Sequence, residues 1–215
     1  MAAVLVLAAC GGDGAERAAD PPGAVLIEFV VAVRMGDSEA VRNLLSEKFL
    51  DRYDLTDEKL ASSFIPALRS KIGPLGPTVE AGFERTIGAD LAVAAFKDAS
   101  ARALPGPRAF ASPLVREEDG WKVEPFGLDL IYGYPDDLSA DSKRPFITFG
   151  VNATGDLKAR LWVDGRELPL KRRPGSPVTF EARPVERLEP GQHLVVAFAK
   201  VGDRVGALAW RSTVE

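Results

Sequence analysis

The spacing of apolar residues in the first part of the chain predicts two helices. Apolar side chains recur every three or four positions, the period of an amphipathic helix. They are Val25, Phe29, Ala32 and Val33 in the first segment and Val41, Leu44 and Leu45 in the second. Gly36 separates the segments, and Asp37 or Ser38 can cap the second helix by accepting a backbone hydrogen bond.

A third helix is expected from about Thr56, whose hydroxyl can serve as its N-cap. Its apolar positions are Leu60, Phe64, Leu68 and Ile72. Pro66 falls inside this segment, and proline lacks the N–H that a helix interior needs, so we expect a kink or a break there. Gly73 and Pro74 end the segment.

From Thr78 onwards the period changes to two, which is typical of strands. The alternating apolar positions are Val79, Ala81, Phe83 and Ile87. Residues 88–90 predict a turn, residues 91–97 a second strand, and Asp119-Gly120 the turn of a later hairpin. Helices followed by about four antiparallel strands predict an α+β arrangement, with the helices packed on a curved antiparallel sheet.

The second half of the chain carries short strand-like runs and no helical period. The runs cover residues 146–152, 158–171, 177–184, 193–201 and 207–214. Turn residues separate them, among them Asp164-Gly165. Several short strands with regular turn signals predict an all-β sandwich, which buries its core between two sheets and needs no disulfide.

The opening of the chain is apolar but short. Residues 2–9 are small or aliphatic, fewer than the roughly 20 residues needed to span a bilayer and within the length of a signal-peptide core. Cys10, the single cysteine, follows at once. Residues 11–23 are mostly small or polar and contain two prolines, so they predict a flexible tether.

Leu7, Ala8, Ala9 and Cys10 together resemble the lipobox of bacterial lipoproteins. The resemblance implies a diacylglyceryl group on Cys10, which would become the mature N-terminus and anchor the protein at the extracytoplasmic face of the membrane. The sequence departs from the family pattern because no Lys or Arg precedes Cys10. The alternative is a buried N-terminal strand with a packed cysteine.

Two further resemblances concern the folds. "MGDSEAVRNLLSEKF" and "REEDGWKVEPFGL" resemble parts of the nuclear transport factor 2-like cone fold, which ketosteroid isomerases and polyketide cyclases share. "LWVDGREL" and "LEPGQHLVVAFAKVGDRVGALAW" resemble bacterial immunoglobulin-like modules. The expected division is a signal peptide (1–9), a tether (10–23), the cone-like domain (24–132), a linker (133–144) and the immunoglobulin-like domain (145–215).

Composition and charge exclude one class of partner. The chain of 215 residues is 46% hydrophobic and 27% charged, with a net charge of −4, as is usual for a globular protein. Its 27 Lys and Arg residues are scattered, whereas a nucleic-acid-binding surface needs them clustered. Nucleic acid is therefore not an expected partner.

Few residues are candidates for catalysis. His193 is the single histidine, and a strand-edge side chain bonding the adjacent loop is the favoured interpretation. A cone pocket can hold a catalytic carboxylate, as ketosteroid isomerases illustrate. The acids on suitable elements are Glu28, Glu80, Glu84, Asp98 and Asp129. Only Asp129 remains a weak catalytic candidate, because the others face water or lie on the polar side of a strand. No metal or other cofactor is expected.

These observations favour a non-enzymatic lipoprotein of the cell envelope. It would attach to the membrane through the diacylglyceryl group on Cys10 and bind a small hydrophobic ligand or an envelope protein through the cone pocket and the sandwich. One alternative is an isomerase-like or cyclase-like enzyme using the cone pocket. Another is a structural or adhesive spacer. Lys171-Arg172-Arg173, the densest basic run, predicts an exposed hairpin end, and contact with anionic lipid head groups is the alternative.

Overall fold

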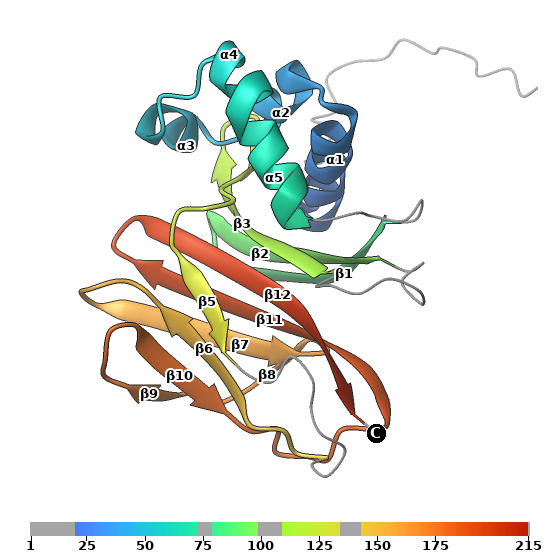
Figure 1. The fold of residues 1–215 in the computed structure, drawn as a ribbon, viewed down its shortest axis with the longest axis vertical. Coiled ribbons are helices and arrows are strands. Elements are labelled where there is room, and N and C mark those ends of the chain that lie inside the picture. Colours follow the sequence, from blue (N-terminus) through green and yellow to red (C-terminus); the bar gives the residue numbers. More distant parts are fainter. Residues whose placement is uncertain (1–19, 73–78, 99–108, 134–142, 215) are drawn as a thin grey trace, which may run out of the picture.

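The computed structural model describes residues 20–72, 79–98, 109–133 and 143–214. The predictions for Leu7, Ala8, Ala9 and Cys10 and for most of the 133–144 linker lie outside these residues. In the described part, helices and three antiparallel sheets form four stacked layers (Figure 1). The helices cover one face of a first sheet, a middle sheet covers the other face, and an outer sheet lies beyond it.

The first helices follow the apolar pattern. α1 (Pro22–Met35) buries Val25, Phe29, Ala32 and Val33, and it ends at Gly36, whose φ of 75° is the left-handed conformation that glycine adopts easily. Asp37 caps α2 (Ser38–Leu44), since its Oδ1 accepts a hydrogen bond from Ala40 N at 3.0 Å. A short α3 (Glu47–Arg52), capped by Ser46, was not predicted as a separate helix.

The predicted third helix continues past Pro66 through a widened turn. Thr56 caps α4 (Asp57–Lys59), with Oγ1 accepting from Lys59 N at 3.3 Å. A π-helical turn, η1 (Leu60–Phe64), then leads into α5 (Ile65–Ile72). The missing N–H of Pro66 falls where the hydrogen-bond pattern changes from π to α, so the helix widens at the position where we expected a kink or break.

The first sheet has the order β1-β2-β3-β4 and is antiparallel throughout. Its strands are β1 (Val79–Gly88), β2 (Leu91–Asp98), β3 (Ala109–Glu117) and β4 (Gly120–Val123). Strands β3 and β4 are joined at the predicted Asp119-Gly120 turn. Both faces of β2 are buried: Ala92, Ala94 and Phe96 pack under the helices, whereas Val93 and Ala95 face the middle sheet.

The other two sheets enclose a second core and form the predicted β-sandwich. The middle sheet has the order β12-β11-β7-β8 and the outer sheet β5-β6-β10-β9. Their strands are β5 (Leu130–Gly133), β6 (Ile147–Val151), β7 (Leu157–Val163), β8 (Arg166–Glu167), β9 (Lys171–Arg173), β10 (Val178–Ala182), β11 (Gly191–Val201) and β12 (Arg204–Val214). Asp164 and Gly165, with φ of 47° and 79°, form the expected turn between β7 and β8.

The first and middle sheets pack directly against each other. Trp162 of the middle sheet is 1% exposed, and its ring centroid lies 5.1 Å from that of Phe83 on β1. Val196 and Phe198 of β11 join the same core, together with Val93 on the opposing sheet. The helical part and the sandwich therefore share a buried apolar interface.

The segment that leaves the first sheet enters the sandwich early. β5 pairs with β6 in antiparallel register, with Leu130 opposite Val151 and Gly133 opposite Thr148. The expected boundary at residue 132 thus lies inside a strand of the outer sheet. Leu128, just ahead of β5, also belongs to the sandwich core.

Candidate functional site

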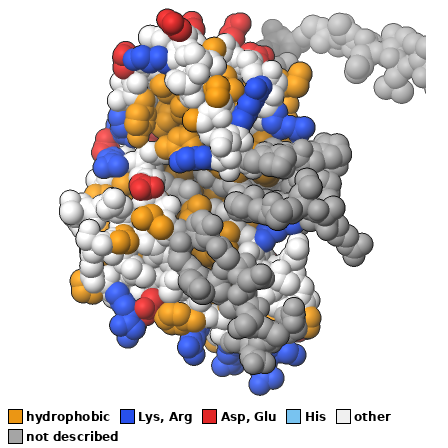
Figure 2. Space-filling view, viewed as in Figure 1, with side chains coloured by type: hydrophobic (Ala, Val, Ile, Leu, Met, Phe, Trp, Pro, Cys, Tyr) orange, Lys and Arg blue, Asp and Glu red, His pale blue; other side chains and the backbone are white. Residues whose placement is uncertain are grey.

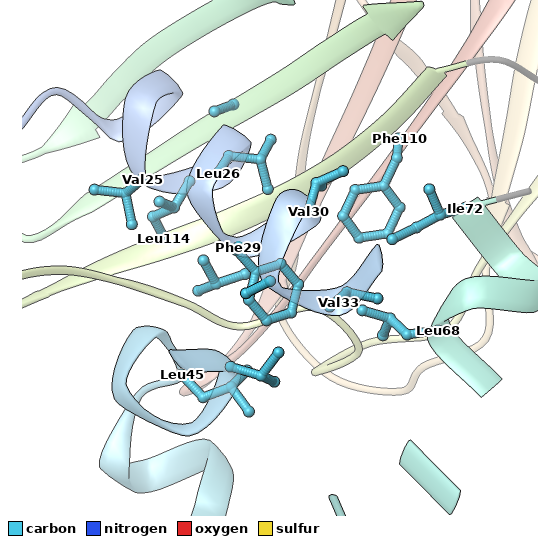
Figure 3. Packing of buried hydrophobic residues seen from close by; sticks show 14 of the residues in the cluster. Val25, Leu26, Phe29, Val30, Val33, Leu45, Leu68, Ile72, Phe110 and Leu114 are labelled. Carbon is cyan, nitrogen blue, oxygen red and sulfur yellow. The ribbon is translucent and has the colours of Figure 1, made fainter. Parts of the chain in front are cut away.

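The space between the helices and the first sheet, where a cone pocket was expected, is filled by side chains. In Figure 3, Val30 of α1 lies beside Phe110 of β3, Val33 lies beside Leu68 of α5, and the Phe29 ring lies on the side of Leu45. Phe29 and Val30 are both 0% exposed. These residues form a packed core, so the candidate site has to lie elsewhere.

A cavity of about 220 Å³ lies where the helical part, the first sheet and the sandwich meet. We call it the junction cavity. Its large apolar walls come from β3, the connection between β4 and β5, β5 and β12. They are Phe110, Phe126, Leu128, Leu130, Leu208 and Trp210. Apolar walls with a few polar groups are typical of sites for small ligands.

Two charged side chains line the junction cavity, Lys71 and Asp129. The Lys71 ammonium lies 4.2 Å from the ring centroid of Phe126, within the range of a cation–π contact. Asp129 is exposed. Within the described residues neither side chain makes an ion pair, so both remain available to a polar group on a ligand.

Close backbone contacts hold one wall of the junction cavity in place. A Cβ at Gly127 would lie 2.3 Å from Val205 O, and one at Gly206 would lie 2.8 Å from Leu128 O. Because neither glycine has a side chain, the segment before β5 can pass over β12 with the two backbones in contact. Arg204 Nε donates to Gly127 O at 2.9 Å, and Tyr53 Oη donates to Phe126 O at 3.0 Å.

Asp129, the weak catalytic candidate, reaches the junction cavity and not a helix–sheet pocket. Its backbone oxygen accepts from Asn152 N at 3.2 Å, which ties the residue to the sandwich. Its carboxylate is exposed to water. Lys71 is the other charged side chain lining the cavity among the residues that the structure describes. The arrangement suits binding a polar group better than abstracting a proton, because a general base works best when shielded from water.

The other acids considered from the sequence lie outside this site. Glu28 and Glu80 are exposed. Glu84 Oε2 accepts from Gly23 N at 2.8 Å, so β1 supplies the negative charge that the first turn of α1 lacks. The side chain of Asp98 lies outside the described residues.

His193 bonds the adjacent loop, as predicted. Its Nε2 lies 2.8 Å from Glu189 O and its Nδ1 lies 2.6 Å from Asp164 Oδ2. Asp164 Oδ1 also accepts from Leu194 N at 2.9 Å. Nδ1 therefore joins β11 to the β7–β8 turn, and Nε2 joins it to the loop ahead of β11, which gives the histidine a structural role.

Sequence reasoning missed a buried carboxylate at Glu124. This side chain is 1% exposed, and its Oε1 accepts from Ser46 Oγ at 3.0 Å. Ser46 Oγ in turn accepts from Phe49 N at 3.1 Å as the N-cap of α3. Glu124 follows Val123 at the end of β4 and precedes Pro125, so strand alternation places it on the same side as Lys122, which is half-buried. A glutamate beside proline at a strand end was the available signal.

Ion pairs link the helical part to the β11–β12 turn. Asp203 Oδ2 lies 2.8 Å from Lys48 Nζ and 3.5 Å from Arg52 Nη2. The hydrogen bond and charge of Lys48 lower the pKa of Asp203 below its ordinary value. These contacts join α3 to the sandwich at its surface.

The described residues contain no group of three or more His, Cys, Asp or Glu side chains able to hold a metal ion. Within the same residues, no helix combines the length and apolarity required to cross a bilayer. No protein-family model and no curated protein sequence matches the chain. The candidate site is therefore argued from its geometry.

Proposed function

We propose that this protein is a lipid-anchored binding protein of the cell envelope that takes up a small, mainly apolar ligand in the junction cavity. The observation that carries the proposal is the apolar cavity with Lys71 and Asp129 in its lining. An anionic group on the ligand would pair with Lys71, whose ammonium is held over Phe126. The acyl chains on Cys10 would supply the membrane attachment.

The proposed fold families fit this arrangement. Helices against a four-stranded antiparallel sheet are what a nuclear transport factor 2-like domain would contribute, and two packed antiparallel sheets are what an immunoglobulin-like domain would contribute. The filled helix–sheet core moves the proposed binding site from the cone interior to the junction. Fold analogy carries little functional weight by itself, so the binding proposal rests on the cavity.

The cavity proposal is tested with 2-naphthoate, an apolar bicycle with one carboxylate, titrated while tryptophan fluorescence is followed. Trp210 lines the junction cavity, so bound naphthoate is expected to quench its emission. Ala207→Leu adds methyl groups into the cavity and is expected to weaken binding at least 10-fold. Lys71→Gln is expected to weaken naphthoate roughly 3- to 10-fold while leaving neutral 2-naphthamide unchanged.

Lys158→Gln is the matched control for Lys71→Gln, because it removes one positive charge from an exposed site away from the junction cavity. It is expected to leave naphthoate affinity unchanged. Equal losses in the two lysine variants, or naphthoate binding unaffected by Ala207→Leu, would contradict a site in this cavity.

Membrane attachment is tested at Cys10. In a bacterial host the wild-type chain is expected in the membrane fraction and labelled by a metabolic palmitate analogue. Cys10→Ala is expected to lose both the label and the membrane pelleting. Wild-type protein that stays soluble and unlabelled would remove the anchored part of the proposal and leave the cavity part standing.

A structural spacer is a second candidate function, favoured by the filled helix–sheet core and the apolar contact between the first and middle sheets. A spacer needs rigidity and no ligand. Membrane attachment without any naphthoate response would support this second candidate.

A further inference from the structure

Two loops lie side by side at one end of the sandwich and expose apolar side chains. Leu188 N donates to Lys143 O at 2.8 Å, which joins residues 183–188 to residues 143–146. Phe146 is 41% exposed and Val185 is 70% exposed. The prolines beside them, Pro145 and Pro184, are buried. Each loop is thus fixed by its proline and presents the neighbouring apolar side chain to the outside.

Basic residues surround these two apolar side chains. Lys143, Arg144, Arg183 and Arg187 are all exposed in the same two loops. Arg183 lies over the ring of Phe146, with its guanidinium carbon 5.1 Å from the ring centroid. The one acid in these loops, Glu186, is paired with Arg166 at 2.5 Å. The surface formed by residues 143–146 and 183–188, here called the basic tip, therefore carries four exposed basic side chains and one paired acid.

The positive charge extends along the adjoining edge of the outer sheet. Strand β9 carries Lys171, Arg172 and Arg173, all exposed, and pairs with β10, which ends one residue before Arg183. Arg173 is paired with Glu181, which leaves Lys171 and Arg172 beside the tip. Figure 2 shows Lys and Arg side chains gathered over the lower end of the molecule, where the sandwich lies.

We propose that the basic tip docks onto an anionic lipid surface, with Phe146 and Val185 entering the head-group region. Lysine and arginine near a membrane surface attract anionic head groups, and apolar side chains among them bury at the boundary of head groups and acyl chains. An acidic protein surface would also match the positive charge. It would not explain why two loops fixed by buried prolines expose an aromatic and an aliphatic side chain. This inference goes beyond the proposed function and does not depend on Cys10.

The test uses the full chain with Cys10→Ser, so that no acyl group contributes to binding. The vesicles contain phosphatidylcholine and about 30% phosphatidylglycerol, an anionic lipid that gives them a negative surface potential. Co-sedimentation is expected with these vesicles, to weaken as salt rises, and to be absent with pure phosphatidylcholine. Arg183→Gln combined with Arg187→Gln is expected to weaken binding about 30-fold. Phe146→Ser combined with Val185→Ser is expected to weaken it roughly 10-fold.

The matched control is Lys158→Gln combined with Lys200→Gln, which removes the same charge. Lys158, near the start of β7, lies opposite Lys200, near the end of β11. The basic tip lies at the other end of these strands, beside the start of β11. The control is expected to lose less than threefold in affinity. Far-UV circular dichroism and thermal midpoints establish that every variant is folded.

A tryptophan reports the insertion directly. Phe146→Trp is expected to give a blue-shifted emission component on anionic vesicles, relative to the parent chain. Equal losses in the tip variants and the control, binding to pure phosphatidylcholine at the same strength, or no co-sedimentation at all would overturn the proposal. In the last case an acidic protein surface would remain as the partner to test.

Discussion

Replacing Trp162 with alanine is expected to lower the free energy of unfolding by about 3–5 kcal/mol, the usual range for removing a fully buried aromatic side chain. Trp162 is 1% exposed and packs against Phe83 across the interface between the first and middle sheets. Because the partners belong to different layers, the loss is expected to affect both parts of the chain at once. Urea denaturation followed by far-UV circular dichroism measures the effect.

The matched control is Phe146→Ala, which truncates an aromatic side chain that is 41% exposed. It is expected to change the free energy of unfolding by less than about 1 kcal/mol. A loss below 1 kcal/mol for Trp162→Ala, or two separate unfolding transitions in the wild-type chain, would contradict a shared core between the layers.

Gly127→Ala is expected to destabilise the protein by about 2–3 kcal/mol and to abolish naphthoate binding. The added Cβ would lie 2.3 Å from Val205 O, a backbone atom that moves only if β12 moves with it. The shift would separate residues 125–130 from β12 and so disturb two walls of the junction cavity. Denaturation curves and the naphthoate titration measure the two effects on one sample.

Gly88→Ala serves as the control for Gly127→Ala. No heavy atom lies within 4 Å of the position of its added Cβ, and its φ lies outside the left-handed region. It is expected to leave stability within about 0.5 kcal/mol and naphthoate binding unchanged. Equal stability of Gly127→Ala and Gly88→Ala would show that the crossing tolerates a side chain.

Local elements were predictable because they depend on neighbouring residues. Asp37 and Thr56 cap helices, and Asp164-Gly165 forms a turn, each through contacts within a few residues. The strand segments of the second half were likewise visible as alternating or apolar runs bounded by turn residues. Pro66 was expected to kink or break the third helix, and the α-helical pattern is interrupted just before it by a π-helical turn that leads into α5.

The stacking of layers was not predicted, although the sequence held a signal for it. Residues 92–96 on β2 and 194–199 on β11 are buried without interruption, and both runs are apolar in sequence without polar alternation. A strand buried on both faces has this pattern, whereas a strand with one solvent-exposed face alternates apolar and polar residues. Two such runs in different halves of the chain indicate that the halves share a core.

The junction cavity could not be predicted from local patterns. Lys71, Phe126 and Trp210 come from three distant parts of the chain and meet only through the crossing of residues 125–130 over β12. Glycine at Gly127 and Gly206 permits that crossing, but a glycine outside a turn motif does not reveal which segment it will contact. Of the acids considered from the sequence, only Asp129 lines the site.

Because both faces of β2 are buried, its core is complete only after later strands have been synthesised. Val93 and Ala95 are covered by side chains of β11 and β12, more than a hundred residues later in the chain. At a synthesis rate of about 5–20 residues per second, the apolar underside of the first sheet stays uncovered for roughly ten seconds. During that interval the uncovered apolar face makes the N-terminal half prone to aggregation.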